Sequence, residues 1–170
     1  MRIYRKWAMP NADTFSIKPI QELIQDYIDS TWSTDFRWID PFVRNSPFKS
    51  RMFMTNDLNP DFEADTHVDA QLFLDTFKPD SVDGVLFDPP YSPRQITECY
   101  QNVGRKTTMQ DTQSAFYSKL KKQIAVIVKD DGYVISLGWN SGGIGKKLGF
   151  EIQEILLVAH GGWHNDTIVT

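Results

Sequence analysis

The sequence predicts an α/β fold in which short buried strands alternate with amphipathic helices. The clearest strand is residues 82–87, a mainly apolar run that stops at a pair of prolines. Prolines cannot donate ladder hydrogen bonds, so the strand must end there. Residues 18–29, in contrast, repeat apolar side chains at helical spacing. The 170 residues suffice for one domain with a buried core, and we take 1–170 as a single domain.

The first half of the chain is expected to hold one long helix and several short strands. Residues 1–13 form a basic tail, and the helix at 18–29 begins with Lys18-Pro19, since proline suits a first helical turn. Only about ten residues separate the first two strands, which is close to the minimum for a crossover with a helix, so loops are expected after both. The expected strands are 35–39, 51–56, 66–68 and 82–87, with a helix at 70–77.

The second half begins with a polar, irregular stretch at 92–110, which we interpret as a lid or substrate-binding loop. A helix at 111–129 follows, and Asp130-Asp131-Gly132 then forms a turn. Strands are expected at 133–137, 150–159 and 166–170, with a short helix at 144–148.

Composition and charge limit the function. A formal net charge of −4 is unusual for a stand-alone DNA-binding protein, so nucleic-acid contacts require local basic patches. The single cysteine, Cys99, excludes an internal disulfide and suits a reducing cytosol. We expect no signal peptide and no membrane association, because no apolar run is long enough to span a bilayer. No metal site is expected, since the residues His67, His160, His164 and Cys99 lack ligand spacing.

The strongest functional signal follows the strand at 82–87. Asp88-Pro89-Pro90-Tyr91 places a carboxylate, a rigid turn and an aromatic ring at the carboxyl end of a strand, where open α/β sheets bind ligands. A plain turn stiffened by proline is the alternative. This run resembles the catalytic motif of the amino-group methyltransferases, which use S-adenosylmethionine to methylate the exocyclic nitrogen of adenine or cytosine, mostly in DNA.

The resemblance implies a Rossmann-like class I S-adenosylmethionine-dependent methyltransferase sheet. Such a sheet has about seven strands with the last one antiparallel, and here the helices after strands one and two are reduced. The resemblance assigns catalysis to Asp88, Pro89, Pro90 and Tyr91. The Asp88 carboxylate and the Pro89 carbonyl accept both N–H groups of the amine and so aim its lone pair at the methyl group. Tyr91 stacks on an extruded base.

The resemblance extends to the segments expected to hold the cofactor. Residues 14–24 resemble the segment before the first strand, and Asp40-Pro41-Phe42 resembles the end of that strand. In the family a glycine-rich turn comes next, whereas residues 43–48 contain no glycine, so the side chains of Arg44, Asn45 and Ser46 become candidates to contact the methionine carboxylate. The cofactor-binding candidates are Phe15, Lys18, Asp40, Pro41, Phe42, Asn45, Ser46, Asp57, Leu58, Asp69 and Ala70.

Two acids among these candidates follow the second and third expected strands. Asp57 lies where a carboxylate grips the ribose hydroxyls of a nucleoside, although an ordinary turn aspartate is the alternative. The resemblance implies that Asp69 reaches the adenine amino group of the cofactor. Asp69 also suits the N-cap of the helix at 70–77, and both roles can hold at once.

The remaining candidates concern the substrate. Arg94 and Arg105 in the loop at 92–110 suit phosphate contacts, with a solvated loop as the alternative. Aromatic and polar residues after the fifth and sixth strands suit a base pocket, with ordinary packing as the alternative. The substrate-binding candidates are Arg94, Trp139, Asn140, Trp163 and His164.

The expected function is methylation of adenine N6 in DNA, as in the small methylases of phages, mobile elements and restriction–modification systems. The family's target-recognition domain has no counterpart in these 170 residues. We therefore expect weak sequence preference, a single-stranded or RNA substrate, or recognition supplied by a partner subunit or homo-oligomer. The alternatives are a catalytically silent nucleic-acid-binding subunit, or the same chemistry on RNA, cytosine N4 or a protein glutamine amide.

Overall fold

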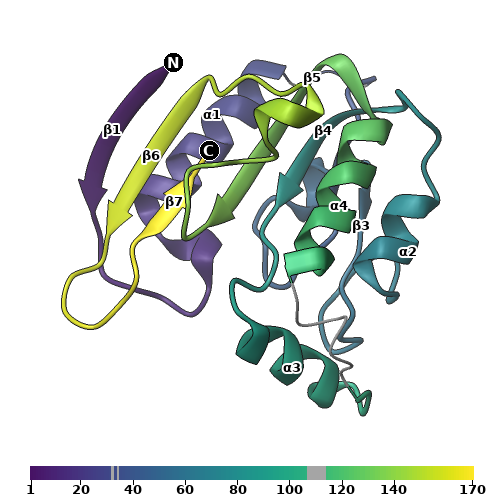
Figure 1. Ribbon diagram of the computed structural model, residues 1–170, viewed down its shortest axis with the longest axis horizontal. Helices are drawn as coiled ribbons and strands as arrows, with labels where there is room; N and C mark the ends of the chain where they lie inside the picture. Colours follow the sequence, from purple (N-terminus) through teal and green to yellow (C-terminus); the bar gives the residue numbers. More distant parts are fainter. Residues whose placement is uncertain (32, 34, 107–113) are drawn as a thin grey trace.

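The computed structural model describes residues 1–31, 33, 35–106 and 114–170. Its strands form one mixed sheet in the order β1-β6-β7-β5-β4-β2-β3 (Figure 1). All neighbours pair in parallel except β7, which is antiparallel to both β5 and β6. The strands are β1 (Arg2–Trp7), β2 (Trp38–Asp40), β3 (Met54–Thr55), β4 (Val82–Phe87), β5 (Val128–Gly138), β6 (Glu154–Ala159) and β7 (Thr167–Val169).

The helices lie on both faces of this sheet. In the view of Figure 1, α1 lies behind the sheet, α2 and α4 lie in front of it, and α3 lies below its lower edge. Within the described residues the helices are α1 (Lys18–Thr31), α2 (Ala70–Asp75), α3 (Pro93–Asn102) and α4 (Ser114–Ile127), with 3-10 turns at Thr14–Ser16, Lys49–Arg51 and Lys146–Leu148.

Each face has its own hydrophobic core, which explains the nearly continuous apolar run of β4. Leu86 packs with α1 on one face, whereas its neighbours Val85 and Phe87 pack with α2 and α4 on the other, because side chains alternate along a strand. The α1 contribution is Ile20, Leu23, Ile24 and Ile28, and the α2 and α4 contribution is Ala70, Phe73, Leu74, Leu120, Ile124 and Ile127.

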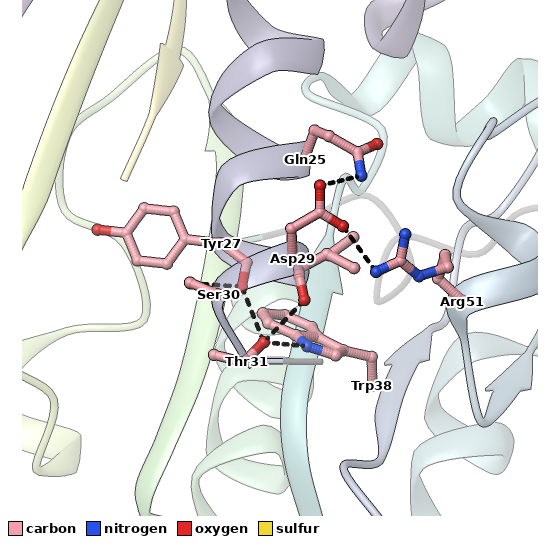
Figure 2. Close-up of polar contacts among 8 residues, drawn as sticks. Gln25, Tyr27, Asp29, Ser30, Thr31, Trp38 and Arg51 are labelled. Atoms are coloured by element: carbon pink, nitrogen blue, oxygen red, sulfur yellow. Dashed lines mark hydrogen bonds and ion pairs between the residues drawn. The ribbon is translucent and has the colours of Figure 1, made fainter. Parts of the chain in front are cut away.

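The end of α1 is tied to β2 through a buried tryptophan. The indole Nε1 of Trp38 donates to Thr31 Oγ1 at 3.0 Å, and Arg51 contacts Asp29 at 2.7 Å beside it (Figure 2). Gly84 of β4 is paired with Trp38, and a Cβ at this position would overlap the indole ring. The glycine within the apolar run therefore makes room for the tryptophan.

Much of the predicted architecture is confirmed. The mixed sheet of seven strands, the antiparallel last strand and the helices near 18–29 and 70–77 are present. Between β2 and α2 the only helical segment is the 3-10 turn Lys49–Arg51, and all of these residues are described, so the expected reduction of helices is also confirmed. The expected helix at 111–129 appears as α4, and its residues 111–113 lie outside the described part.

Two assignments in the first half of the chain were wrong, a tail that is a strand and a strand that is not one. Residues 2–7 are not a tail but the edge strand β1, which pairs in parallel with β6; in β1 only Tyr4 is part-buried, so no alternating apolar pattern marks it. Residues 66–68 are not a strand, because Thr66 makes only an isolated bridge to Asn56.

Two segments predicted as irregular are regular. The expected loop at 92–110 begins with helix α3, in which Ser92 caps the first turn through a bond from Gln95 N to its Oγ, 3.3 Å, and a proline follows. The expected turn at 130–132 lies inside the long strand β5, where the register with β4 shifts. A bulge absorbs the extra residues there without ending the strand.

The order of the strands reverses between β2 and β4. From β2 the chain runs outward to β3 at the sheet edge and then returns to β4 on the other side of β2. Such a reversal opens a crevice outside the carboxyl ends of the two adjacent strands. Asp40 ends β2 and Asp88 directly follows β4, so both acids lie at this point.

Candidate active site

A cavity of about 670 Å³ lies at this carboxyl edge. Its walls come from the segments that follow β1 to β6, together with α3 and one residue of α4. This volume falls within the range of small-molecule sites. The crevice at the reversal of strand order is therefore large enough for a nucleoside-sized ligand.

Asp88 lies on the cavity wall next to the hydroxyl of Tyr91, which donates a hydrogen bond to Asp88 Oδ1. Burial raises the pKa of Asp88 to about 6, and the bond from Tyr91 and the charge of Arg44 oppose that rise. Burial and the adjacent carboxylate also raise the pKa of Tyr91 well above its usual value, so the phenol stays protonated. Asp88 thus changes from acid to carboxylate just below neutral pH.

The turn after Asp88 is held by two helices. Gln95 Oε1 of α3 accepts from the backbone N–H of Tyr91 at 2.7 Å, and the hydroxyl of Tyr117 on α4 donates to the carbonyl of Pro90. The Tyr91 ring packs edge-on against Trp139 with centroids 5.8 Å apart. The resemblance assigns the carbonyl of Pro89 as the catalytic acceptor. The Tyr117 hydroxyl bonds to the carbonyl of Pro90 instead, so it does not occupy the Pro89 carbonyl.

Asp57 lines the cavity in a fixed orientation. Its Oδ2 accepts from the backbone N–H of Arg44 at 3.0 Å, and its Oδ1 accepts from that of Asn59 at 2.9 Å. A carboxylate oxygen has two lone pairs, so each oxygen keeps one for a ligand. Asp57 can therefore accept from a pair of hydroxyls while both backbone bonds stay in place.

Asp69 caps α2 as predicted, since its Oδ1 accepts from Gln71 N at 3.0 Å. Its Oδ2 accepts from the hydroxyl of Tyr100 on α3 and lies 3.6 Å from Arg105 Nη1. These contacts join α3 to the far wall of the cavity. A contact between Asp69 Oδ2 and a ligand amino group consequently requires Tyr100 to move.

Asp40 does not lie where a cofactor ligand was expected. It is fully buried and does not line the cavity. Its Oδ1 accepts from Phe42 N at 2.9 Å, and its Oδ2 has no hydrogen-bond partner among the described residues. Burial raises the pKa of Asp40 well above its usual value, and the charges of Asp88 and Asp57 add to this rise. Asp40 therefore shapes the turn after β2 through its bond to Phe42 and does not face the cavity.

The other predicted residues divide into two groups. Besides Asp57, Asp69, Asp88 and Tyr91, the predicted residues that line the cavity are Pro41, Phe42, Leu58, Ala70, Pro89, Pro90, Trp139, Trp163 and His164. Those that do not line it are Phe15, Lys18, Asp40, Asn45, Ser46, Arg94 and Asn140.

The second group lies elsewhere for local reasons. Phe15 and Ser46 are buried, and Phe15 packs edge-on against another ring of the α1 core. Lys18 and Arg94 point along their own helices into solvent, where they pair with acids four residues later. Asn140 Oδ1 accepts from Gly142 N at 3.0 Å within an exposed turn.

Several cavity residues escaped sequence reasoning. The signal for α3 was present, because Ile96 and Tyr100 stand four residues apart after Ser92-Pro93. In the segment after β1, residues 10–12 gave no signal, whereas Thr14 and Ile17 lie in the stretch 14–24 that the resemblance assigns to the cofactor side. The contribution of this segment depends on His160, which is buried and bonds to Ala8 O at 3.0 Å and, through its other nitrogen, to Thr167 Oγ1 at 2.9 Å. The lining residues missed are Pro10, Asn11, Ala12, Thr14, Ile17, Asn56, Asn59, Phe62, Gln95, Ile96, Glu98, Cys99, Tyr100, Asn102, Phe116, His160, Asn165 and Thr167.

Within the described ranges, no three His, Cys, Asp or Glu side chains gather in a way that would hold a metal ion. Nor is any described helix long and apolar enough to cross a membrane. Comparison with models of known protein families finds no match to the chain, and comparison with curated proteins finds none either. The functional argument therefore depends on the geometry of the cavity.

Proposed function

We propose that the protein transfers a methyl group from S-adenosylmethionine to the exocyclic N6 of adenine in DNA. The observation that carries this proposal is that Asp57 and Asp88 line one cavity at the reversal of strand order. Asp57 suits a ribose, and Asp88 begins the Asp-Pro-Pro-Tyr turn. The mixed sheet and its antiparallel last strand agree with the class I methyltransferase fold that the resemblance implies.

The charge of the cavity fits this cofactor. The lining carboxylates are Asp57, Asp69, Asp88 and Glu98, whereas Arg44 is the one Lys or Arg among the described lining residues. S-adenosylmethionine supplies an electrophilic methyl group on a sulfonium and carries a second positive charge on its ammonium. An acidic cavity stabilises both charges.

The residues of the chain would act by positioning and hydrogen bonding. Ionised Asp88 and the Pro89 carbonyl would accept the two N–H groups of adenine and direct the nitrogen lone pair toward the methyl group. As the N–C bond forms and the C–S bond breaks, the nitrogen loses one proton, and Asp88 is placed to receive it. Tyr91 donates to Asp88 in the structure and would have to release it in order to stack on the base.

The substrate end of the cavity favours an extruded base. Trp139 stands edge-on to Tyr91, and Trp163 and His164 lie exposed at the mouth on the β6–β7 hairpin. Aromatic rings in this arrangement suit stacking with bases of any sequence. A recognition subunit or a second copy would supply sequence choice, and the exposed thiol of Cys99 suits a cytoplasmic location.

The test combines binding and transfer. Calorimetric titration with S-adenosylhomocysteine should show binding that Asp57→Ala weakens and Asp88→Asn retains. Labelled-methyl transfer onto DNA should be lost in Asp88→Asn. Mass spectrometry of the methylated nucleoside separates adenine from cytosine and DNA from RNA. If wild type binds the cofactor but methylates no nucleic acid, the enzyme proposal is rejected. Nucleic-acid binding without cofactor binding would instead indicate a catalytically silent subunit.

A further inference from the structure

Arg44 adopts a left-handed backbone conformation, which residues with a side chain rarely adopt. Its φ is 40°, in the left-handed region, at the place where the chain turns after Asp40-Pro41-Phe42. Two backbone bonds hold it there, because Arg44 N–H donates to Asp57 Oδ2 at 3.0 Å and Val43 N–H donates to Asn56 O at 3.0 Å. Glycine adopts this conformation without strain. A strained arginine at a site of this kind points to a function of its side chain.

The side chain of Arg44 extends along the cavity wall. Its guanidinium lies over the ring of Phe62, 5.6 Å from the centroid, and both residues line the cavity. Within the described residues the guanidinium forms no ion pair, whereas that of Arg105 is paired with Asp69 at 3.6 Å. Arg44 therefore presents positive charge that no acid of the described residues neutralises by direct contact.

The charge of Arg44 reaches the centre of the site. It opposes the rise in the pKa of Asp88, of Tyr91 and of Cys99. Asp88 and Tyr91 belong to the Asp-Pro-Pro-Tyr turn and Cys99 to α3, so the charge of Arg44 acts on two sides of the cavity that it lines. It is the cavity's one lining Lys or Arg in the described chain, surrounded by carboxylates.

We propose that Arg44 binds the carboxylate of the amino-acid end of the cofactor, in place of the backbone N–H groups of a glycine-rich turn. This inference rests on the proposed function and names the residue that selects the cofactor's amino-acid end. The ligand class that matches is a molecule with a single carboxylate close to cationic groups. Arginine suits such a contact, since its planar fork binds a carboxylate through two parallel hydrogen bonds.

The surrounding acids argue against a phosphate as the occupant. A phosphate carries up to two negative charges and would lie beside Asp57 and Asp88, where like charges repel in a partly desolvated site. A lone carboxylate with an ammonium on the adjacent carbon instead lets Arg44 and the acids each meet an opposite charge. The left-handed backbone keeps the arginine in this position through its bond to Asp57.

The experiment compares two ligands that differ only in the carboxylate. Binding of S-adenosylmethionine and of its decarboxylated form is measured by calorimetry without nucleic acid, for wild type, Arg44→Gly, Arg44→Lys and Arg37→Met. Arg37 is the matched control, because its guanidinium lies over Phe53 at 4.9 Å outside the cavity. Arg44→Gly should weaken binding of the carboxylate ligand about 10- to 100-fold and leave the decarboxylated ligand unchanged. Arg44→Lys should lose less, and Arg37→Met should match wild type.

Thermal unfolding separates binding from folding. Arg44→Gly relieves the strained φ, so its Tm should rise by about 2–4 °C while its affinity falls. Equal loss of affinity for both ligands, or no loss for either, would overturn the role of Arg44 and leave the proposed function standing. Failure of wild type to bind either ligand would refute the proposed function, and the role of Arg44 with it.

Discussion

Replacing Asp88 by asparagine should inactivate the protein and also stabilise it, by an amount that depends on pH. The pKa of Asp88 is raised from 3.8 to about 6 in the folded state. The carboxylate form is thus disfavoured by folding, so wild type loses stability as pH rises from about 4 through 6. Asparagine has no such titration, and its Oδ1 still accepts from the Tyr91 hydroxyl.

The two pKa values give the size of the effect. By linkage, the advantage of Asp88→Asn over wild type grows from about 0.5 kcal/mol at pH 4 to about 3 kcal/mol at pH 8. The same substitution should also reduce the rise in the pKa of Asp40, because the charge of Asp88 contributes to that rise. This second effect also favours the folded state of Asp88→Asn. Urea unfolding at pH 4, 6 and 8 measures this difference without any need for activity.

A matched variant controls for the loss of one negative charge. Asp26→Asn removes an exposed carboxylate from α1, far from the strand ends, and should show no comparable growth between pH 4 and 8. If Asp88→Asn gains no more stability at pH 8 than at pH 4, Asp88 is not a desolvated acid, and the acceptor chemistry assigned to it fails.

Three further variants test other parts of the structure. Gly84→Ala should lower the free energy of unfolding by about 1–3 kcal/mol, because its Cβ would overlap the Trp38 ring; an unchanged urea midpoint would contradict this packing. Tyr117→Phe should lower kcat about tenfold and keep cofactor affinity, since it removes only the bond to Pro90; an unchanged kcat would mean that this bond does not position the turn. Trp163→Ala should weaken nucleic-acid binding about 5- to 100-fold with an unchanged Tm, because under the proposed function this fully exposed ring would stack on a base; unchanged affinity would exclude it from the binding surface.

The elements that were predicted correctly from the sequence share one property: their buried apolar side chains repeat at the spacing of a strand or a helix. Strand β4 and helix α1 place apolar residues at the spacing of their secondary structure, and prolines mark their ends. Strand β1 lacks that signal because it is an edge strand whose side chains are mostly exposed. Its pairing with β6, 150 residues away, is a tertiary contact that local pattern does not encode.

Sequence predicted which acids lie at the ends of strands, but it did not predict the direction in which each side chain points. Asp88 directly follows β4 and Asp57 lies two residues after β3, so their position in the cavity follows from topology. Asp40 is the last residue of β2, but its side chain turns inward to the N–H of Phe42. Arg94 was expected to face substrate from a loop, and the helical start at Ser92 rotates it into solvent. Orientation of this kind depends on backbone geometry that the order of residues does not reveal.

The electrostatics of the cavity connect cofactor binding to the acceptor role of Asp88. With a pKa of about 6, Asp88 is partly protonated just below neutral pH, and a protonated acid is a weaker acceptor for the amine and cannot receive its proton. A sulfonium bound nearby favours the carboxylate and lowers this pKa. A carboxylate that pairs with Arg44 would act in the opposite direction, by screening the charge that now opposes the rise. Under the proposed function, the sulfonium would therefore lie closer to Asp88 than the carboxylate of the cofactor does, with the methyl group beside the acid and the carboxylate toward Arg44 and Phe62.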